Sequence, residues 1–407
     1  YLLLLLAGYL WLSAEKRVAG LPRPLRFTIT LLYWLPAAAL PAGLALSAII
    51  PFTEWTAGLR TWYQNFILVF FVSIALPATA LLLADLVRIA RYLAGRVISS
   101  LRKAWKQIPR NRWLLRTGWV AGALAFLAMT AGTLFGTYDF RVREVSVTLE
   151  GLPRSFNGYR VVQLSDIHLG SWTSKPELER AVQMVNALRP DAIFFTGDMF
   201  NYVTAEGAGF ENILGKLAAP AGVFAIMGNH DYGDYVAWSS PGAKEKNLAA
   251  VGDWYRTLGW TLLRNSHAFL VRGTDSIALL GVENWGATRR FQRLGDLGKA
   301  LQGAENAPVK ILLTHDPSHW DSIVSRHYPN IALTLSGHTH GGQIGLEAGR
   351  ARWSIVQGIS SRWGGLYENP APGAPQYLYV NRGLGTIGYA GRLGILPEIT
   401  LVVLKAP

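Results

Sequence analysis

Three long runs without a charged residue constrain the fold of this chain more than any other feature of its sequence. They cover Phe27 to Ile50, Phe66 to Ala84 and Thr117 to Tyr138. Because a helix needs about 20 apolar residues to cross a bilayer core of about 30 Å, each run is a candidate membrane span. Pro36, Pro41 and Pro77 interrupt the first two runs, but neighbouring helices satisfy the carbonyls that proline leaves without a donor.

The apolar start of the chain, Tyr1 to Leu12, is shorter and predicts part of a further span. We therefore expect about four transmembrane helices. The alternative is a helical core buried in a soluble protein, but three uncharged runs of this length are rare outside membranes. Half of the residues are hydrophobic and only 16% are charged, which fits a chain that lies partly in lipid.

Positive charge is concentrated in the apolar part of the chain. Residues 1–137 hold 14 Lys and Arg against 3 acidic residues, a net charge of +11, whereas residues 138–407 hold 25 against 23, a net of +2. The second part lacks the concentrated positive charge of a duplex-binding domain, so we expect no nucleic-acid partner. The first part predicts the lipid bilayer as a partner.

The loops between the apolar runs predict an orientation. Residues 13–26 and 88–116 are rich in Lys and Arg, while residues 51–65 contain Arg60 alone. Because short basic loops remain in the cytoplasm, everything after about Tyr138 is predicted to be extracytoplasmic. A transport pathway through the bilayer is disfavoured, since Asp85 alone lies near the edge of a span.

From Val145 onward the sequence changes to short β-rich runs separated by Gly, Pro, Asn and Asp, with helical stretches such as Lys175 to Leu188. Residues 1–138 therefore predict a helical transmembrane anchor, and residues 139–407 predict one α/β domain. The expected strands are Val145–Leu149, Arg160–Leu164, Ala192–Phe195, Val223–Met227, Ser276–Val282, Lys310–Leu313, Ile331–Leu335, Tyr377–Val380 and Thr400–Leu404.

Five short polar clusters follow the ends of strand-like runs, where open α/β sheets gather their ligands. They are Asp166-Ile167-His168, Gly197-Asp198, Gly228-Asn229-His230-Asp231, Thr314-His315 and Gly337-His338-Thr339-His340. Five of the eight histidines lie in these clusters, and the other three are expected to be ordinary polar residues. The chain has no cysteine, and imidazole and carboxylate donors suit divalent ions such as Mn, Fe, Co or Zn. The preceding glycines predict turns that a side chain would obstruct.

Taken in order, the motifs D-x-H, G-D, G-N-H-D, H and G-H-T-H resemble those of the calcineurin-like metallophosphoesterase superfamily. Three further segments look like its bacterial membrane-anchored branch: Gly341-Gly342-Gln343, Asn381-Arg382-Gly383-Leu384-Gly385 and Pro397-Glu398-Ile399-Thr400. The resemblance covers about Val145 to Leu404. It implies two β-sheets flanked by helices, an αββα sandwich, in a protein of the bacterial cytoplasmic membrane.

The same resemblance implies two divalent metal ions. Asp166, His168 and His340 would hold one ion, Asn229, His315 and His338 would hold the second, and Asp198 would bridge them. A hydroxide between the metals would attack a phosphate mono- or diester. His230 would donate a proton to the leaving group or stabilise its charge, with Asp231 either orienting His230 or capping a helix.

Two functions of different classes follow. The first is a membrane-anchored dimetal phosphoesterase whose substrate is a phosphoester of a lipid or of the cell envelope. The second is a non-catalytic membrane protein whose outer domain binds metal structurally and whose helices bind a partner, since one span would suffice as an anchor. Metal analysis together with a phosphoesterase assay distinguishes the two, because the non-catalytic protein would bind metal without hydrolysing a phosphoester.

Several segments outside the clusters have two interpretations each. We expect residues 232–246 to form either a lid or a surface excursion. A later Gly-rich loop is expected to contact substrate, to rest on lipid head groups or to pack locally through Arg362, Trp363 and Tyr367. We expect a solvated face, in preference to a phosphate clamp, at Arg289, Arg290 and Arg293. The sequence assigns no role to Glu283-Asn284.

Overall fold

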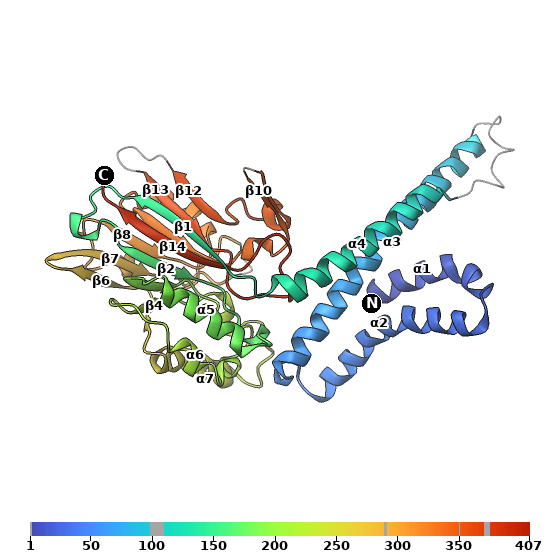
Figure 1. The fold of residues 1–407 in the computed structure, drawn as a ribbon, viewed down its shortest axis with the longest axis horizontal. Helices are drawn as coiled ribbons and strands as arrows, with labels where there is room; N and C mark the ends of the chain where they lie inside the picture. The colour runs from blue at the N-terminus through green and yellow to red at the C-terminus, as the bar shows by residue number, and fades with distance from the viewer. Residues whose placement is uncertain (1, 98–109, 289–290, 350, 370–374) are drawn as a thin grey trace. The chain divides into compact units, whose positions relative to one another are not determined.

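The structure is a computed structural model that describes residues 2–97, 110–288, 291–349, 351–369 and 375–407 (Figure 1). The chain divides into two compact units, Tyr1–Ala131 and Gly132–Pro407. Four α-helices make up most of the described part of the first unit: α1 (Leu2–Ala19), α2 (Arg23–Ile49), α3 (Ala57–Val97) and α4 (Arg112–Ala131).

Three helical segments of the described chain are long and apolar enough to cross a membrane: Arg23–Ile49, Ala57–Ala94 and Arg112–Gly136. They coincide with the three uncharged runs, so the prediction of a membrane-spanning region is confirmed. The first two contain the expected interior prolines. Helix α1 extends beyond the predicted Leu12 to Ala19, and its last turns carry charged residues.

Close packing of α3 against α4 follows from small residues on α4. A methyl group added to Gly122 would lie 2.4 Å from the carbonyl oxygen of Ser73, and one added to Gly118 would lie 2.4 Å from the side chain of Ala80. Glycine at these positions lets the two backbones approach without a cavity or a clash. The third uncharged run is rich in Gly and Ala, and this composition therefore serves helix contact.

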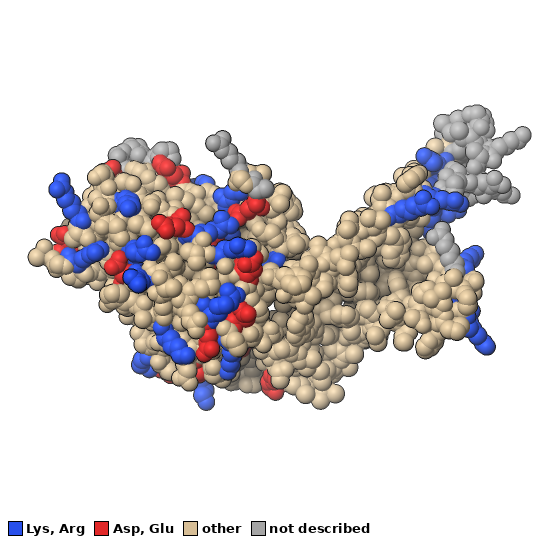
Figure 2. Space-filling model, in the orientation of Figure 1, with Lys and Arg blue, Asp and Glu red and all other residues tan. Residues whose placement is uncertain are grey.

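The charges of the first unit are few and lie mainly at one end. In Figure 2 the blue side chains of this unit gather where α1 meets α2 and where α3 and α4 approach their connection, while its long sides are tan. Of the basic loop 88–116, residues 98–109, and with them Arg102, Lys103 and Lys106, lie outside the described residues. Asp85 accepts hydrogen bonds from Arg110 at 2.6 and 2.8 Å and from the Tyr9 hydroxyl at 2.7 Å, so this carboxylate is paired within the unit.

Two six-stranded sheets and a separate hairpin form the second unit. The first sheet has the order β1 (Arg141–Thr148), β14 (Glu398–Lys405), β2 (Arg160–Leu164), β3 (Ala192–Phe195), β4 (Val223–Ala225) and β5 (Thr261–Leu262). The second has the order β12 (Gly365–Asn369), β13 (Gln376–Val380), β9 (Leu333–Ser336), β8 (Lys310–Leu313), β7 (Asp275–Gly281) and β6 (Ser266–Arg272). The hairpin consists of β10 (Gly345–Ala348) and β11 (Ala351–Ser354).

Helices cover the outer face of each sheet. They are α5 (Lys175–Ala187), α6 (Glu211–Leu214), α7 (Pro241–Thr257), α8 (Leu297–Leu301) and α9 (Ser325–His327). Buried residues of α5 and α7 pack on the first sheet, and those of α8 pack on the second. A separate core between the sheets contains Phe194 and Val402 of one sheet and Leu279 and Leu335 of the other. The layers are helix, sheet, sheet and helix, which confirms the expected sandwich.

Every expected strand is present, although several limits differ. Strand β4 ends at Ala225, before the predicted Met227, because the following residues already turn toward the polar cluster. Strand β9 starts at Leu333 and β1 starts at Arg141, ahead of the predicted Val145. Strands β5, β6, β10, β11 and β12 were missing from the sequence prediction, since they are short or lie at exposed edges where apolar periodicity is weak. Helix α5 has almost its predicted limits.

Strand direction brings the polar clusters together. Strands β2, β3 and β4 run parallel in the first sheet, and β7, β8, β9 and β13 run parallel in the second. The carboxyl ends of parallel neighbours lie at the same edge of a sheet. The clusters that follow β2, β3, β4, β8 and β9 therefore meet in one region.

Candidate metal centre

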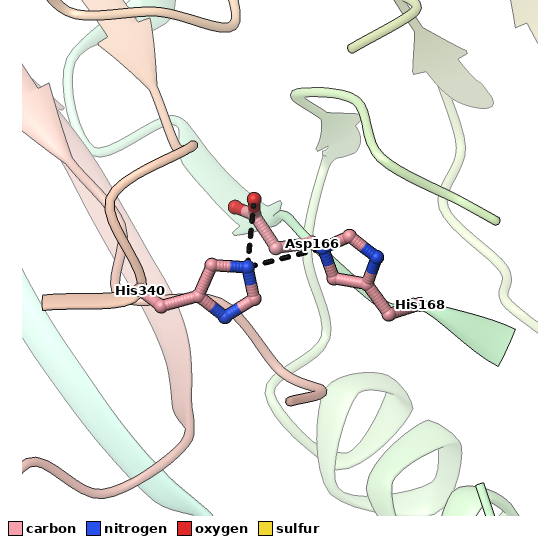
Figure 3. Close-up of side chains that lie close together, drawn as sticks. All are labelled: Asp166, His168 and His340. Atoms are coloured by element: carbon pink, nitrogen blue, oxygen red, sulfur yellow. Dashed lines mark hydrogen bonds and ion pairs between the residues drawn. The ribbon is translucent and has the colours of Figure 1, made fainter. Parts of the chain in front are cut away.

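The first group of converging side chains is Asp166, His168 and His340, drawn in Figure 3. One donor atom of each residue lies within 4.8 Å of the others, and all three side chains are buried. The Nε2 atoms of His168 and His340 are 3.0 Å apart, and His340 Nε2 is 3.4 Å from Asp166 Oδ1. Two imidazole nitrogens and a carboxylate oxygen aimed at one point form a donor set for a divalent ion.

A second group, Asp198, His315 and His338, satisfies the same distance limit. His315 Nε2 lies 3.1 Å from Asp198 Oδ2, and His338 Nδ1 lies 3.3 Å from His315 Nε2. The same Oδ2 of Asp198 is 3.6 Å from His168 Nε2 in the first group. The carboxylate of Asp198 therefore faces both groups, which is the position that a bridging ligand requires.

Asn229 is the remaining residue that the sequence assigns to the second cation. The residue is 6% exposed, and its Oδ1 has no hydrogen-bond partner among the described residues, while its Nδ2 donates to the Tyr235 hydroxyl at 2.8 Å. A buried amide oxygen without a donor costs free energy unless a cation or water satisfies it. The donor set and this unsatisfied oxygen both fit two divalent cations.

Backbone carbonyls fix which nitrogen of two histidines faces the centre. His168 Nδ1 lies 3.2 Å from the Phe200 carbonyl oxygen, and His315 Nδ1 lies 2.8 Å from that of Thr196. With the proton on Nδ1 donated to a carbonyl, the lone pair of Nε2 points toward the other ligands.

His230 lies beside the first group, where its ring meets that of His168 edge-on with ring centres 4.9 Å apart. Its Nδ1 is 2.8 Å from the Asn201 carbonyl oxygen, and its ring stacks on Tyr235 with ring centres 4.2 Å apart. Its backbone N–H donates to Asp198 Oδ1 at 2.8 Å. A ring held through Nδ1 leaves Nε2 as the nitrogen through which it can exchange a proton.

Asp231 has one of the two roles expected for it, because its carboxylate accepts the backbone N–H of Gly228 and so caps the start of the short 3₁₀ helix Asn229–Tyr232. Its carboxylate accepts backbone N–H bonds from Gly228, Asp198 and Met199 at 2.9–3.0 Å, and another from Phe200. It therefore shapes the loop that carries Asp198, while the Asn201 carbonyl orients His230. Burial, reinforced by the Asp198 charge, raises the pKa of Asp231 to about 7.

Burial and mutual charge perturb the donor residues strongly. Burial raises the pKa of Asp166 to about 7 and lowers that of His168 to about 3. Burial opposes protonation of His315, but the adjacent Asp198 carboxylate outweighs it and raises the pKa of His315 to about 10. In the metal-free protein a protonated His315 therefore neutralises Asp198, and a divalent cation would replace that proton.

The donor loops are held in an uncommon backbone conformation. Asp166, His168, Asp198, His338 and His340 all have positive φ, between 49° and 70°. Such angles are rare outside glycine and cluster at functional sites. Gly197 also has positive φ, at 97°, as expected for a turn, whereas Gly228 and Gly337 provide space: a methyl group on Gly228 would lie 2.2 Å from Asp198 Oδ1.

Sequence reasoning missed Arg392, which connects two loops of the centre. This buried guanidinium donates to the carbonyl oxygens of His340 at 3.0 Å, Arg382 at 2.8 Å and Gly383 at 3.1 Å, and to that of Gly385. The loop that carries His340 is thereby joined to the segment that follows β13. The available signal was an arginine in an otherwise apolar, glycine-rich stretch.

Other residues singled out in the sequence pack locally. Arg362 lies 3.3 Å from Asp321 and over the rings of Trp320 and Tyr367, and Trp363 is buried. Arg293 donates to the Gly286 carbonyl and stacks on Trp285, while Arg289 and Arg290 lie outside the described residues. Glu283 pairs with Arg264. His319 lies 3.0 Å from the Thr314 hydroxyl and His267 lies 3.2 Å from the Ala300 carbonyl oxygen, as expected for ordinary polar histidines.

Comparison with known proteins gives two family matches. The profile of the calcineurin-like phosphoesterases matches residues 159–342, and that of a transmembrane domain of calcineurin-like phosphoesterases, the 4TM phosphoesterase domain, matches residues 1–137. The chain is 34% identical to a transmembrane protein with metallophosphoesterase domain from Danio rerio, over 76% of this chain and 67% of the relative. It is 31% identical to the uncharacterized metallophosphoesterase YkuE of Bacillus subtilis, over 70% and 94%. It is 30% identical to the UDP-2,3-diacylglucosamine pyrophosphatase LpxG of Chlamydia muridarum, over 58% and 81%.

The fold, the two donor groups and these relatives define a metal-dependent phosphoester hydrolase attached to a membrane-spanning region. The chain belongs to the calcineurin-like metallophosphoesterase family. The three relatives are named as metallophosphoesterase proteins or as an enzyme, so the non-catalytic alternative is not favoured.

Proposed function

We propose that the chain hydrolyses a phosphate mono- or diester of a lipid or cell-envelope molecule at a centre of two divalent cations. One cation, of Mn, Fe, Zn or Co, would lie among Asp166, His168 and His340, and the other among Asn229, His315 and His338, with Asp198 between them. The observation that carries this proposal is the carboxylate of Asp198 facing both donor groups, together with the unsatisfied buried Oδ1 of Asn229.

Two bound cations would supply positive charge for the phosphoryl oxygens and would lower the pKa of water. The protein's own contribution is to position the ligands and to move a proton. Asn201 and Tyr235 hold the His230 ring, so that its Nε2 can give a proton to the leaving oxygen. Asp231 and Arg392 hold the loops of Asp198 and His340, so the ligands need little rearrangement when a substrate binds.

Two variants test the assignment of roles. Asp198→Asn removes the charge that faces both groups and should abolish most hydrolysis of an aryl phosphodiester. His230→Ala should keep the metal content and lose turnover, because it removes a proton donor and no ligand. His327→Ala, an exposed histidine of α9, is the matched control. Wild-type turnover in Asp198→Asn, or metal loss in His230→Ala, would contradict the proposal.

The lipid or envelope substrate is supported by the membrane-spanning region and by the lipid-linked nucleotide in the name of the LpxG relatives from Chlamydia muridarum and Chlamydia trachomatis. The metal-reconstituted full chain should therefore hydrolyse phospholipids or nucleotide-linked lipids in vesicles faster than simple aryl phosphates. Turnover confined to the aryl phosphates would contradict a lipid substrate while leaving the hydrolase assignment intact.

The second unit is proposed to face the outside of the bacterial cytoplasmic membrane. The support is the grouping of basic residues at one end of the helical unit, since such residues remain in the cytoplasm (Figure 2). The chain has no cysteine, so a single exposed cysteine at Val271 can be labelled in intact cells with a membrane-impermeant maleimide. Labelling only after the membrane is permeabilised would contradict this orientation and would indicate that the second unit faces the cytoplasm.

A further inference from the structure

The hairpin β10–β11 turns its polar face toward the rest of the unit. Glu347 and Arg352 are cross-strand partners, and Arg352 Nε lies 3.2 Å from Glu347 Oε1. Glu347 Oε1 also accepts a bond from Nη2 of the buried Arg382 at 2.6 Å, and Arg143 of β1 pairs with the same carboxylate. The charged side of this hairpin is therefore its inward side.

The outward side of the hairpin is apolar. Leu346 and Trp353 are cross-strand partners, and the short 3₁₀ helix Ile355–Gly358, whose C-cap is Ile359, follows β11 directly. The exposed fractions of Leu346, Trp353 and Ile355 are 58%, 54% and 58%, and that of Ile359 is 90%. We call these four residues the apolar hairpin face. An antiparallel pair on a water-exposed surface normally has the opposite arrangement, with apolar residues inward and charged residues outward.

Backbone contacts join the hairpin to the end of a membrane span. The candidate span Arg112–Gly136 ends in Gly132–Gly136, which belongs to the second unit, and there Leu134 and Phe135 are 60% and 77% exposed. The Arg392 N–H donates to the Gly132 carbonyl at 3.1 Å, and the Gly345 N–H donates to the Leu393 carbonyl at 2.9 Å. One short loop thus holds both the end of the span and the start of β10.

The apolar hairpin face also adjoins the metal centre. The Ser354 hydroxyl donates to the Gly341 carbonyl at 2.5 Å, next to His340. A methyl group on Gly342 would lie 3.0 Å from the side chain of Ile355. Arg392 also connects the end of the span with the metal centre. Its backbone N–H donates a hydrogen bond to the Gly132 carbonyl, and its side chain donates one to the His340 carbonyl.

We infer that the apolar hairpin face inserts into the headgroup region of the bilayer that holds the spans, and so brings phosphoesters of that layer to the metal centre. Continuity with the end of a span identifies the bilayer as the occupant. Trp and branched aliphatic side chains are suited to this depth, since Trp is enriched at membrane interfaces. The claim about the substrate rests on the proposed function, whereas the claim about insertion does not.

Single-cysteine labelling tests insertion directly. Ile359→Cys and Leu346→Cys, each carrying an environment-sensitive fluorophore, are compared with Val271→Cys in nanodiscs that hold one copy of the full chain. Val271 is 65% exposed on β6, which Figure 1 shows at the opposite end of this unit from β10. Nitroxide-bearing lipids should quench the labels at 359 and 346 and leave the label at 271 bright. Equal quenching at all three positions, or shielding from an aqueous quencher without lipid quenching, would overturn insertion.

Activity measurements test the link to the substrate. The double variant Leu346→Ser/Ile359→Ser should hydrolyse a soluble aryl phosphodiester at the wild-type rate and a vesicle-embedded phosphoester about tenfold more slowly, since two large apolar contacts are lost. An equal fall on both substrates would overturn the inference by indicating a damaged centre. If the wild type hydrolyses neither substrate, the proposed function fails, and the labels still decide whether the face inserts.

Discussion

Tyr235→Phe tests whether Asn229 is a metal ligand without altering any donor atom. The Tyr235 hydroxyl accepts a 2.8 Å bond from Asn229 Nδ2, and this bond fixes the amide while Oδ1 has no hydrogen-bond partner among the described residues. Phenylalanine removes the hydroxyl and keeps the ring that stacks on His230. The expected effect is therefore a weaker second metal with an unchanged catalytic histidine.

The magnitude follows from one neutral hydrogen bond. Such a bond contributes about 0.5–1.5 kcal/mol, which corresponds to a change of about 2- to 12-fold in a dissociation constant. Tyr235 is half-buried, so water can partly replace its hydroxyl and the lower part of this range is expected. The first group consists of Asp166, His168 and His340, none of which loses a donor atom, so it should keep its affinity.

Calorimetric titration of the metal-stripped full chain with Mn²⁺ resolves the two sites. Tyr235→Phe should weaken one site by about 2- to 12-fold and retain kcat at saturating metal. Tyr235→Leu should weaken the same site and also lower kcat, because the ring that supports His230 is lost. Tyr377→Phe, on β13, is the control. Unchanged affinity at both sites, or equal losses at both, would refute the assignment of Asn229 Oδ1 to the second cation.

Three further predictions use other contacts of the centre. Gly228→Ala should abolish activity because its methyl group would lie 2.2 Å from Asp198 Oδ1, whereas Gly252→Ala in α7 meets no atom within 4 Å and should leave turnover unchanged in the same assay. The melting temperature of the metal-free protein should fall as pH rises from about 7 to 10: the raised pKa of His315 stabilises the folded state while His315 is protonated, and this contribution is lost as pH passes about 10. Mn²⁺ should suppress that pH dependence, and an equal fall with metal present would contradict the ion-pair explanation. Arg392→Lys should lower metal affinity while far-ultraviolet circular dichroism stays unchanged, since one ammonium cannot reach four carbonyls; wild-type affinity would show that Arg392 does not position His340.

The sequence predicted the fold of the second unit and the positions of the donor residues for one physical reason. Buried parallel strands appear as apolar runs, and the chemistry follows their carboxyl ends, so the five polar clusters could be expected at strand ends. The grouping of His168 with His340, which are 172 positions apart, came from the resemblance to the metallophosphoesterase superfamily. Short edge strands give no comparable signal. The hairpin β10–β11 was missed because its apolar residues face outward, so its pattern does not mark a core.

The supporting residues could not be predicted because their function depends on backbone geometry. Asp231 looks like a helix cap or a partner of His230 in the sequence. In the structure it caps a short 3₁₀ helix and also accepts backbone N–H groups of the loop that carries Asp198, so that it holds two loops through four bonds. Arg392 likewise donates hydrogen bonds to backbone carbonyl groups. Because every residue has such a carbonyl, the partners of Arg392 cannot be identified from the sequence. Both residues stabilise loops whose donor residues have positive φ. Such loops need partners that satisfy their backbone groups, because strained backbone persists only where surrounding contacts hold it. The donor residues of this centre can therefore be recognised from short sequence motifs. The contacts that hold them in place can be recognised only from the folded structure.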